Sequence, residues 1–332
     1  MPQRFIGLAI ILASFLFAWL IMDVDNFIDS PLQIPAEGEV YELRPGSTIS
    51  TLANDLHKKG YLGKPLYLRL LARWDGSATK IKAGEYQLDP GLNPRDLLNL
   101  LTSGKVISYS LTLIEGWNFQ QVLQAVGQHS ALTQTLKDLT PGEIMKELGY
   151  PDEHPEGRFL PDTYHFPRGT TDKAFLGRAR RAMQKTLERE WSERQEGLPL
   201  KTPYEALILA SIVEKETGLA SERPAIAGVF IRRLKKGMRL QTDPTVIYAM
   251  GEEYKGNIRR RDLKRDNPYN TYVYKGLTPT PISMPGADAI RSVLHPEDGN
   301  ALYFVARGNG SHQFSATLKE HNRAVRKYQL KR

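Results

Sequence analysis

The chain has 332 residues, of which 41% are hydrophobic and 25% charged, a composition typical of globular proteins. Its formal net charge of +8 would attract a partner that carries negative charge. Basic runs such as the arginines at 259–261 come without a helix-turn-helix, zinc-finger or stacking-aromatic signature, so no nucleic-acid site is predicted. The absence of cysteine excludes disulfides, a cysteine nucleophile and a lipid-modified cysteine anchor.

Residues 5–22 form an uncharged apolar stretch that is long enough to cross a bilayer core of ~30 Å as a helix. Arg4 precedes this stretch and Asp23 follows it, so the positive-inside rule places the N-terminus in the cytoplasm and the rest of the chain on the far side. A cleaved signal peptide is the alternative, but residues 19–22 are bulky where a cleavage site needs small residues. We therefore expect an uncleaved anchor over residues 1–25.

After a short tether at 26–39, the pattern predicts a small domain over residues 40–106, with a strand, two helices, a second strand and a further helix in that order. The segment 46–53 resembles the G-x-T-h-x-x-h-A opening of LysM-like modules, in which h is apolar. Those modules are β-α-α-β units that bind N-acetylglucosamine polymers. A domain that only spaces the rest of the chain from the membrane is the alternative. The five elements are predicted at 41–43, 47–60, 65–74, 81–88 and 93–101.

From residue 107 to residue 332, helices and strands are interspersed without a regular βαβ repeat, so we expect an α+β fold. The most apolar helix of this region is predicted at 203–217. It is preceded by a long charged helix at 172–195 and followed by a helix at 221–236, which Gly237 ends. The other predicted elements are strands at 109–114, 301–306 and 312–315, and helices at 118–128, 141–148 and 317–329.

The sequence lacks the HExxH, GxSxG, P-loop and GxGxxG signatures, and its seven histidines have no metal-ligand spacing. Two glutamates stand out near the end of the apolar helix. At 100° per residue, Glu216 falls on the apolar face in line with Leu209 and Val213, whereas Glu214 points to nearly the opposite side. The two residues are therefore expected to be one inward acid and one more peripheral acid, and not a carboxylate pair.

An acid on the core-facing side of an apolar helix is costly to ionise, because desolvation raises its pKa. Glu216 would then stay protonated near neutral pH and could give its proton to a glycosidic oxygen. A salt bridge with a buried arginine such as Arg232 or Arg239 is an equally good interpretation of the helical pattern alone.

Two polar segments downstream indicate a cleft. The segment 237–245 is expected to be a polar loop that presents glutamine, threonine and aspartate side chains in series. The segment 267–272 alternates aromatic rings with amide and hydroxyl groups. Sugars are bound in this way, because aromatic faces stack on C–H surfaces while amides and hydroxyls form hydrogen bonds with the sugar. Each segment alone is more often a turn, but together with an inward glutamate they predict a polar, aromatic-lined cleft.

Several long motifs together resemble the endolytic murein transglycosylases, the YceG-like family. They are IVEKET at 212–217, RLQTDPTVIYAMG at 239–251, YNTY at 269–272 and LYFVARGNGSHQF at 302–314. The resemblance implies cleavage of the β-1,4 bond between N-acetylmuramic acid and N-acetylglucosamine in nascent peptidoglycan. No water is used in this reaction, because the muramyl C6 hydroxyl attacks C1 and leaves a 1,6-anhydro ring.

The resemblance also implies that one glutamate, Glu216, acts first as acid and then as base, without a cofactor or a metal. It implies a location in the cell inner membrane, a catalytic domain in the periplasm, and action beside peptidoglycan synthases. His312 and Asn322 are weaker candidates for the site, and the segment 259–266 is given no role. The residues that the resemblance places along the cleft are Thr217, Gln241, Thr242, Asp243, Tyr269, Asn270, Thr271, Tyr272, Asp162 and Tyr164.

Two alternatives remain open. A hydrolase would use Asp243 or Asp162 as a second carboxylate beside Glu216 and would leave a reducing end. A non-catalytic scaffold that binds peptidoglycan would need neither acid. Members of the family have also been labelled aminodeoxychorismate lyases, but that activity needs a lysine-bound pyridoxal phosphate, for which the sequence has no motif.

Overall fold

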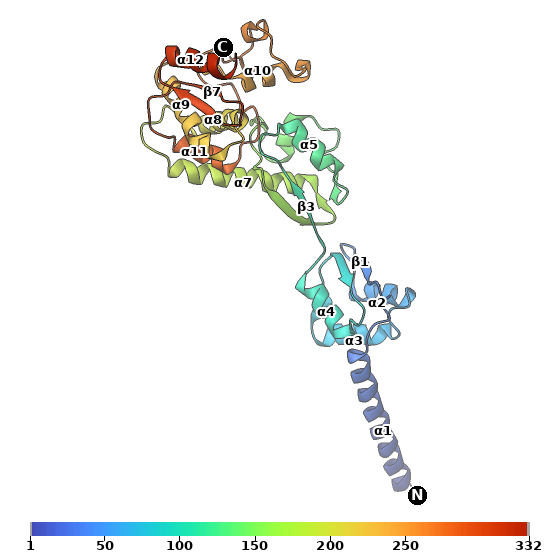
Figure 1. Ribbon diagram of the computed structural model, residues 1–332. Helices are drawn as coiled ribbons and strands as arrows, with labels where there is room; N and C mark the ends of the chain where they lie inside the picture. Colours follow the sequence, from blue (N-terminus) through green and yellow to red (C-terminus); the bar gives the residue numbers. More distant parts are fainter. Residues whose placement is uncertain (1, 331–332) are drawn as a thin grey trace. The chain divides into compact units, whose positions relative to one another are not determined.

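The computed structural model describes residues 2–330 and has a mixed α+β architecture, as predicted. The chain divides into two compact units (Figure 1). The first comprises the chain up to Tyr109 together with His165–Gly169, and the second comprises Ser110–Tyr164 together with the chain from Thr170 onward. The domain limits that we infer from the sequence, with a tether at 26–39 and a boundary at 106/107, stay a prediction.

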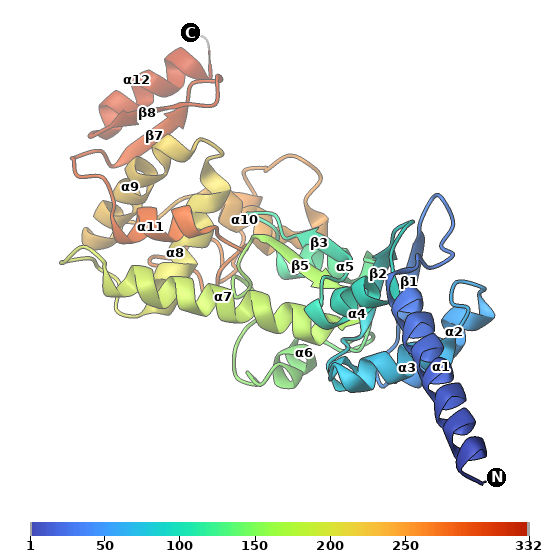
Figure 2. The ribbon, with the colours of Figure 1, turned by 90° about the horizontal axis from the view of Figure 1, so that it is seen from below.

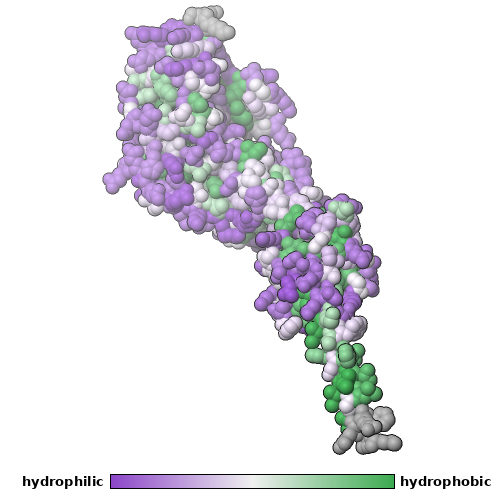
Figure 3. Space-filling model, turned by 60° about the horizontal axis from the view of Figure 1, so that its bottom comes forward, coloured by the Kyte–Doolittle hydropathy of each residue, from purple (hydrophilic) through white to green (hydrophobic). Residues whose placement is uncertain are grey.

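The first unit begins with the helix α1 (Pro2–Asp29). Its segment Ile6–Asp29 has a mean hydropathy of 2.2 in its apolar window, and none of that window is buried. Figure 3 shows α1 as a hydrophobic rod. By length and composition, this helix can cross a membrane, and it is the one such helix among the described residues. The helix α1 is thus compatible with the expected membrane anchor. The direction in which it would insert stays a prediction.

The rest of the first unit has the predicted order of strands and helices. The strands β1 and β2 pair in antiparallel register, with Tyr41 opposite Tyr86. Leu52 and Leu56, one turn apart on α2, are fully buried beneath this pair with Leu68 of α3. The likeness to LysM modules stays a prediction. The bounds are β1 (Glu39–Leu43), α2 (Ile49–Lys58), α3 (Pro65–Trp74), β2 (Gly84–Leu88) and α4 (Pro94–Ser103).

The second unit is built around the helix α8 (Pro203–Glu216). Thr202 starts this helix, because its side chain accepts a hydrogen bond from the backbone N–H of Glu205. Every residue from 206 to 214 is buried, so α8 has no exposed face over this stretch. It is packed by α7, α9, α10 and α11, and Figure 2 shows α7, α9 and α11 beside it. The bounds are α7 (Asp172–Ser192), α9 (Arg223–Lys235), α10 (Asp243–Met250) and α11 (Ala287–Leu294).

Two helices of this unit were not expected. The sequence predicts a loop over the whole segment 237–245. In the structure this loop stops at Thr242 and α10 begins at Asp243, because Pro244 favours the first turn of a helix. The second unexpected helix is α11, which packs against α8. The remaining elements are β3 (Ser108–Thr112), α5 (Phe119–Gln128), β4 (Leu132–Thr133), α6 (Pro141–Glu147), β5 (Thr163–Pro167), β6 (Thr170–Thr171), β7 (Tyr303–Ala306), β8 (His312–Ser315) and α12 (Leu318–Tyr328).

Candidate functional site

Glu216 is the last residue of α8. The helix ends there because Thr217 is extended, and the Thr217 hydroxyl accepts a hydrogen bond of 3.0 Å from the backbone N–H of Leu219. The carboxylate of Glu216 is half-buried and accepts a hydrogen bond from the hydroxyl of the buried Thr242. The C-terminal end of α8 therefore places the Glu216 carboxylate in contact with Thr242, the residue immediately before α10.

Glu216 has no ion pair within residues 2–330. Arg232, one of the two arginines considered as its partner, donates instead to the carbonyls of Ala301 and Glu297 at 2.7 and 2.9 Å. Arg239, the other, is exposed. The salt-bridge interpretation of Glu216 is therefore wrong for this structure.

The surroundings of Glu216 favour its protonated form. The pKa of this carboxyl is raised to about 7, chiefly by burial and also by the negative charge of Asp243, while the hydrogen bond from Thr242 and the charges of His312 and Arg233 lower it. An acid with this pKa is available both as donor and as acceptor of a proton near neutral pH.

A cluster of threonines positions Thr242. The backbone N–H of Thr242 donates to the Thr271 hydroxyl at 3.1 Å, and the hydroxyls of Thr245 and Thr271 lie 2.9 Å apart. The neighbouring Gln241 has a positive φ of 51° and donates its N–H to the Thr271 carbonyl at 3.2 Å. Thr271 thus ties together two polar segments that the sequence separates.

The side chains of Asp243 and Tyr272 meet in the same way. The Tyr272 hydroxyl donates to Oδ1 of Asp243 at 2.6 Å, and burial holds the pKa of Tyr272 well above its usual range. Tyr272 therefore stays neutral and keeps its proton, which it shares with Asp243 only as a hydrogen-bond donor. Since the charge of Asp243 acts on the pKa of Glu216, these two carboxyls lie in one electrostatic environment.

Two other residues of the YNTY motif support the loop. Asn270 is buried, and its amide donates to the carbonyls of Asp262 and Arg265 at 3.2 and 2.9 Å. The ring of Tyr269 lies 5.0 Å from the ring of Tyr248. Both residues hold the 262–272 segment in place, and their role toward a sugar stays a prediction.

Asp162 and Tyr164 occupy a different part of the second unit. Asp162 is exposed, and its carboxylate accepts a hydrogen bond of 2.7 Å from the backbone N–H of Thr163. Tyr164 is buried with its ring edge against Phe175 of α7, and its hydroxyl donates to the Leu160 carbonyl. No hydrogen bond or ion pair in the described part of the chain connects either residue to Glu216, so their assignment to the cleft stays a prediction.

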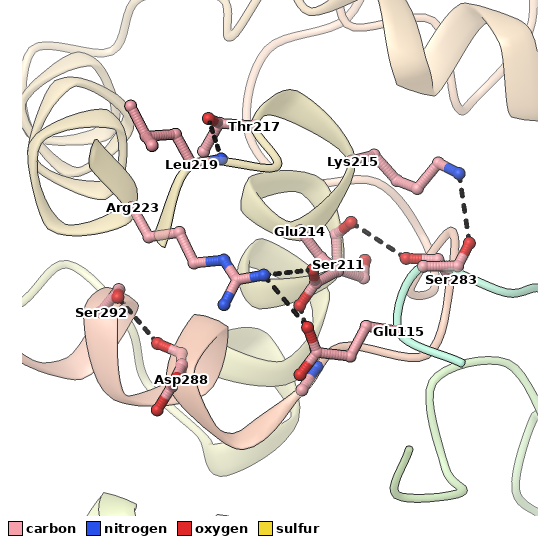
Figure 4. A network of polar contacts seen from close by, with 12 residues as sticks. Glu115, Ser211, Glu214, Lys215, Thr217, Leu219, Arg223, Ser283, Asp288 and Ser292 are labelled. Atoms are coloured by element: carbon pink, nitrogen blue, oxygen red, sulfur yellow. Dashed lines mark hydrogen bonds and ion pairs between the residues drawn. The ribbon is translucent and has the colours of Figure 1, made fainter. Parts of the chain in front are cut away.

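Glu214 is not the peripheral acid that the helical pattern predicts (Figure 4). It is buried, and its carboxylate accepts from Arg223 at 2.9 Å and from the backbone N–H of Gly286 at 3.0 Å. Arg223 also pairs with Glu115 at 3.1 Å. The prediction fails because neighbouring helices cover α8 on all sides, so a side chain opposite the apolar face is also buried.

Two further residues were missed by the sequence analysis. Arg233 is buried and donates to the carbonyls of Leu302 and Leu240, both at 2.7 Å, while its charge lowers the pKa of Glu216. It stands beside Arg232 in the sequence, and nothing in the pattern distinguishes the inward arginine from its neighbour. Glu156 is the other, and its one signal in the sequence is that it lies six residues before the candidate Asp162.

Glu156 lines a cavity of about 550 Å³, which is within the size range of ligand pockets. It accepts hydrogen bonds from the N–H of Phe119 at 3.0 Å and from the Tyr248 hydroxyl at 3.2 Å, and burial raises its pKa to about 7. Lys215 and Pro244 also line this cavity. These residues directly adjoin Glu216 and Asp243 in the sequence, although neither of these two acids lines the cavity.

His312 is held near the acid by Glu222. Its Nδ1 lies 2.7 Å from Oε2 of Glu222, and its backbone N–H donates to Oε1 at 3.0 Å. Its charge lowers the pKa of Glu216, which places it in the same electrostatic environment. Asn322, the other weaker candidate, is exposed on α12.

A model of the YceG-like family matches residues 41–327. This chain belongs to the YceG-like family. It is 33% identical over 305 residues to a protein of Bacillus subtilis (strain 168) named endolytic murein transglycosylase, covering 85% of this chain and 82% of that protein. A protein of the same name from Streptococcus pneumoniae (strain D39) is 29% identical over 335 residues, and the match covers 90% of this chain but 60% of that longer protein.

A solved structure supports the same assignment. The crystal structure of a YceG-like protein from Listeria monocytogenes is 31% identical in sequence and has a TM-score of 0.54 with this chain. The match covers 87% of this chain and all of the solved chain. The family resemblance that the motifs indicate is therefore confirmed, from the first unit through β8.

Proposed function

We propose that this protein is a lytic transglycosylase, an enzyme that cleaves the glycan strands of peptidoglycan. The names of its relatives in Bacillus and Streptococcus support this activity, as does the family model that spans both units. We further propose that the bond cleaved is the β-1,4 bond between N-acetylmuramic acid and N-acetylglucosamine within a strand. The product would be a 1,6-anhydromuramyl end.

The observation that carries this proposal is the state of Glu216. It is a half-buried acid with a pKa raised to about 7 and a threonine hydroxyl on its carboxylate. In the first step, Glu216 donates its proton to the glycosidic oxygen as the bond to the muramyl C1 breaks. In the second step, the resulting carboxylate accepts the proton of the muramyl C6 hydroxyl, whose oxygen forms the new bond to C1. The proton count balances with one carboxyl and no water.

The glycan is proposed to lie across the end of α8. Gln241, Thr242, Asp243 and Tyr272 would face the sugars next to the cleaved bond, and the cavity beside Glu156 would hold a more distant part of the strand. Thr271 acts indirectly, since its hydrogen bonds position Thr242. We place α1 in the inner membrane with the second unit in the periplasm, near the synthases that produce nascent strands.

A hydrolase is the second candidate, and Asp243 is the observation in its favour. A retaining or inverting hydrolase needs a second carboxylate near the acid, and the charge of Asp243 is close enough to Glu216 to raise its pKa. The two candidates differ in their product, because a hydrolase adds water and leaves a reducing end.

The decisive experiment is the incubation of the full chain, in detergent, with purified glycan strands, followed by mass spectrometry of the products. Glu216→Gln is compared with Glu205→Gln, a matched change at the other end of the same helix. We expect anhydromuramyl ends from the wild type and from Glu205→Gln, and a loss of roughly 10²–10⁴-fold in rate for Glu216→Gln.

Each other outcome has a definite meaning. Ends heavier by one water would establish the hydrolase. Undiminished cleavage by Glu216→Gln would remove this residue from the chemistry. Strand binding without cleavage by the wild type would favour the scaffold.

A further inference from the structure

The helix α3 of the first unit is apolar on two opposite faces. Leu68, Leu71 and Ala72 are buried in the core of the unit. On the other side, Leu66, Leu70 and Trp74 are spaced four residues apart and are 57%, 51% and 86% exposed. Residues at this spacing lie on one face of a helix, so they form a continuous stripe, which we call the outer stripe. A contiguous exposed stripe of this kind marks a surface that meets something other than water.

The outer stripe lies beside the end of the candidate membrane span. Lys64, immediately before α3, pairs with Asp23 of α1 at 2.5 Å, and the Tyr67 hydroxyl donates to the same carboxylate at 2.8 Å. The rings of Tyr67 and Phe27 also meet edge to face at 5.5 Å. Asp23 is the first charge after the apolar residues 5–22, so it marks where α1 would leave the hydrocarbon core. Thus α3 begins at the level of the membrane surface.

The figures agree with these contacts. In Figure 1, α3 lies at the end of the first unit from which α1 leaves, and β1 lies at the other end. Figure 2, seen from below, shows α3 beside α1 with no other element in front of it. Hydrophobic surface also appears on the first unit beside the end of α1 in Figure 3.

The charges of α3 suit a membrane with anionic lipids. The helix contains no acidic residue, and Arg73 is exposed next to the outer stripe. Leucine and tryptophan side chains flanked by arginine are typical of helices that lie in the interface, where the rings and alkyl chains enter the acyl region and the cations meet phosphates.

We propose that α3 lies in the headgroup region of the membrane that α1 crosses, with the outer stripe inserted toward the acyl chains and Arg73 against the phosphates of anionic phospholipids. This inference rests on the proposed anchor, and it adds a second contact that would hold the first unit against the bilayer. The first unit would then keep a fixed orientation on the membrane surface instead of rotating freely about its connection to α1.

The chain has no cysteine, so a single introduced cysteine gives a unique label. The full chain is reconstituted in vesicles that contain phosphatidylglycerol, with a bimane label on Leu66→Cys, Leu70→Cys or Trp74→Cys in turn. Quenching by spin-labelled lipids then reports the depth of each label. Val40→Cys on β1 is the matched control, because Val40 is an apolar residue of the same unit with 52% exposure. Phe15→Cys reports the anchor itself.

We expect the three stripe labels to be quenched at least about twofold more than the Val40 label, by spin labels near the headgroup, and the Phe15 label to be quenched by spin labels deep in the acyl chains. Stripe labels quenched no more than the Val40 label, with Phe15 quenched, would overturn the inference and leave the anchor intact. An unquenched Phe15 label would refute the anchor and the inference with it, and the glycan assay would be unaffected.

Shielding of the stripe labels that appears only at high protein-to-lipid ratio, or only in membranes that contain other proteins, would also overturn the inference. In those cases a second copy or a partner helix would cover the stripe instead of lipid. Because all three positions are exposed, the substitutions leave the core untouched, and circular dichroism of each variant should match the wild type.

Discussion

The hydroxyl of Thr242 donates a hydrogen bond to the carboxylate of Glu216, while the next residue, Asp243, acts on the same carboxylate with its negative charge. The hydrogen bond lowers the pKa of Glu216 and the charge raises it. Two adjacent residues at the start of α10 therefore tune one acid in opposite directions, and each can be changed separately.

Replacement of Thr242 by valine removes the hydroxyl and should raise the pKa of Glu216. In the proposed reaction Glu216 must be protonated to begin, so kcat/KM should fall as pH rises through this pKa. The falling limb of the pH profile should therefore move to higher pH in Thr242→Val. The control is Thr242→Ser, which keeps the hydroxyl and should leave the limb in place. A limb that moves equally in both variants would contradict the role of the hydrogen bond.

Replacement of Asp243 by asparagine should have the opposite effect. The amide oxygen can still accept the hydrogen bond of Tyr272, but the negative charge beside Glu216 is lost. The pKa of Glu216 should fall, so the falling limb of kcat/KM should move to lower pH, and the product should remain the anhydromuramyl end. Loss of all cleavage with wild-type folding would instead identify Asp243 as the second carboxylate of a hydrolase.

The raised pKa of Glu216 should also appear in the stability of the protein. Because this pKa is higher in the folded state than the ordinary value of 4.5, proton binding stabilises the fold below pH 4.5, and that contribution is lost as pH rises through about 7. Glu216→Gln carries no charge at any pH. Its free energy of unfolding should be close to that of the wild type at pH 4.5 and exceed it by roughly 3 kcal/mol at pH 8. Denaturant titrations at the two pH values measure this difference, and equal differences at both would refute it.

Breaking the buried ion pair between Arg223 and Glu214 should destabilise the fold. Arg223→Met leaves the carboxylate of Glu214 buried without its cation, and we expect the free energy of unfolding to fall by about 3 kcal/mol. Lys173→Met is the control, because Lys173 and Glu147 form an exposed pair whose loss should leave the free energy of unfolding nearly unchanged. Thermal or denaturant unfolding compares the two variants. Similar losses for both would show that the network in Figure 4 contributes little.

Gly157 is predicted to tolerate no side chain. Its φ is +77°, and a Cβ at this position would lie 2.6 Å from the Pro281 ring. Gly157→Ala should therefore destabilise the fold by roughly 2 kcal/mol or more. Gly142→Ala is the matched control in α6, where a Cβ meets no atom within 4 Å, and this variant should be neutral or slightly stabilised. A neutral Gly157→Ala would show that the 155–158 turn can shift.

Local sequence patterns predicted most of the helices and strands closely. The helix at 65–74 matches α3 at both ends, because proline starts it and its apolar residues recur at helical spacing. By contrast, α11 was missed although Ala289, Ile290, Val293 and Leu294 also have helical spacing. The helix is short and follows a proline-rich segment, and both features favour a loop over a helix at this place in the sequence.

The candidate site was predictable only in part, for a physical reason. A helical wheel describes one helix in isolation, and it correctly places Glu216 away from Glu214. It cannot show that neighbouring helices also cover the second face, which is why Glu214 was expected to be peripheral. Nor can it choose between Arg232 and Arg233, because that choice depends in part on the carbonyl groups of Ala301 and Leu302, which lie 69 positions away from them. Long-range packing of this kind is not encoded in any local pattern.

The position of Glu216 at the very end of α8 has a consequence for a complete catalytic cycle. The last carbonyl groups of a helix carry partial negative charge, so a carboxylate at that end experiences electrostatic repulsion that an uncharged carboxyl does not. This repulsion acts in the same direction as the burial that raises the pKa of Glu216, and it would favour reprotonation of the carboxylate that the proposed first step leaves. In the proposed reaction, recovery of that proton from the sugar hydroxyl would restore the resting enzyme in the step that closes the anhydro ring, and no separate regeneration step would be required.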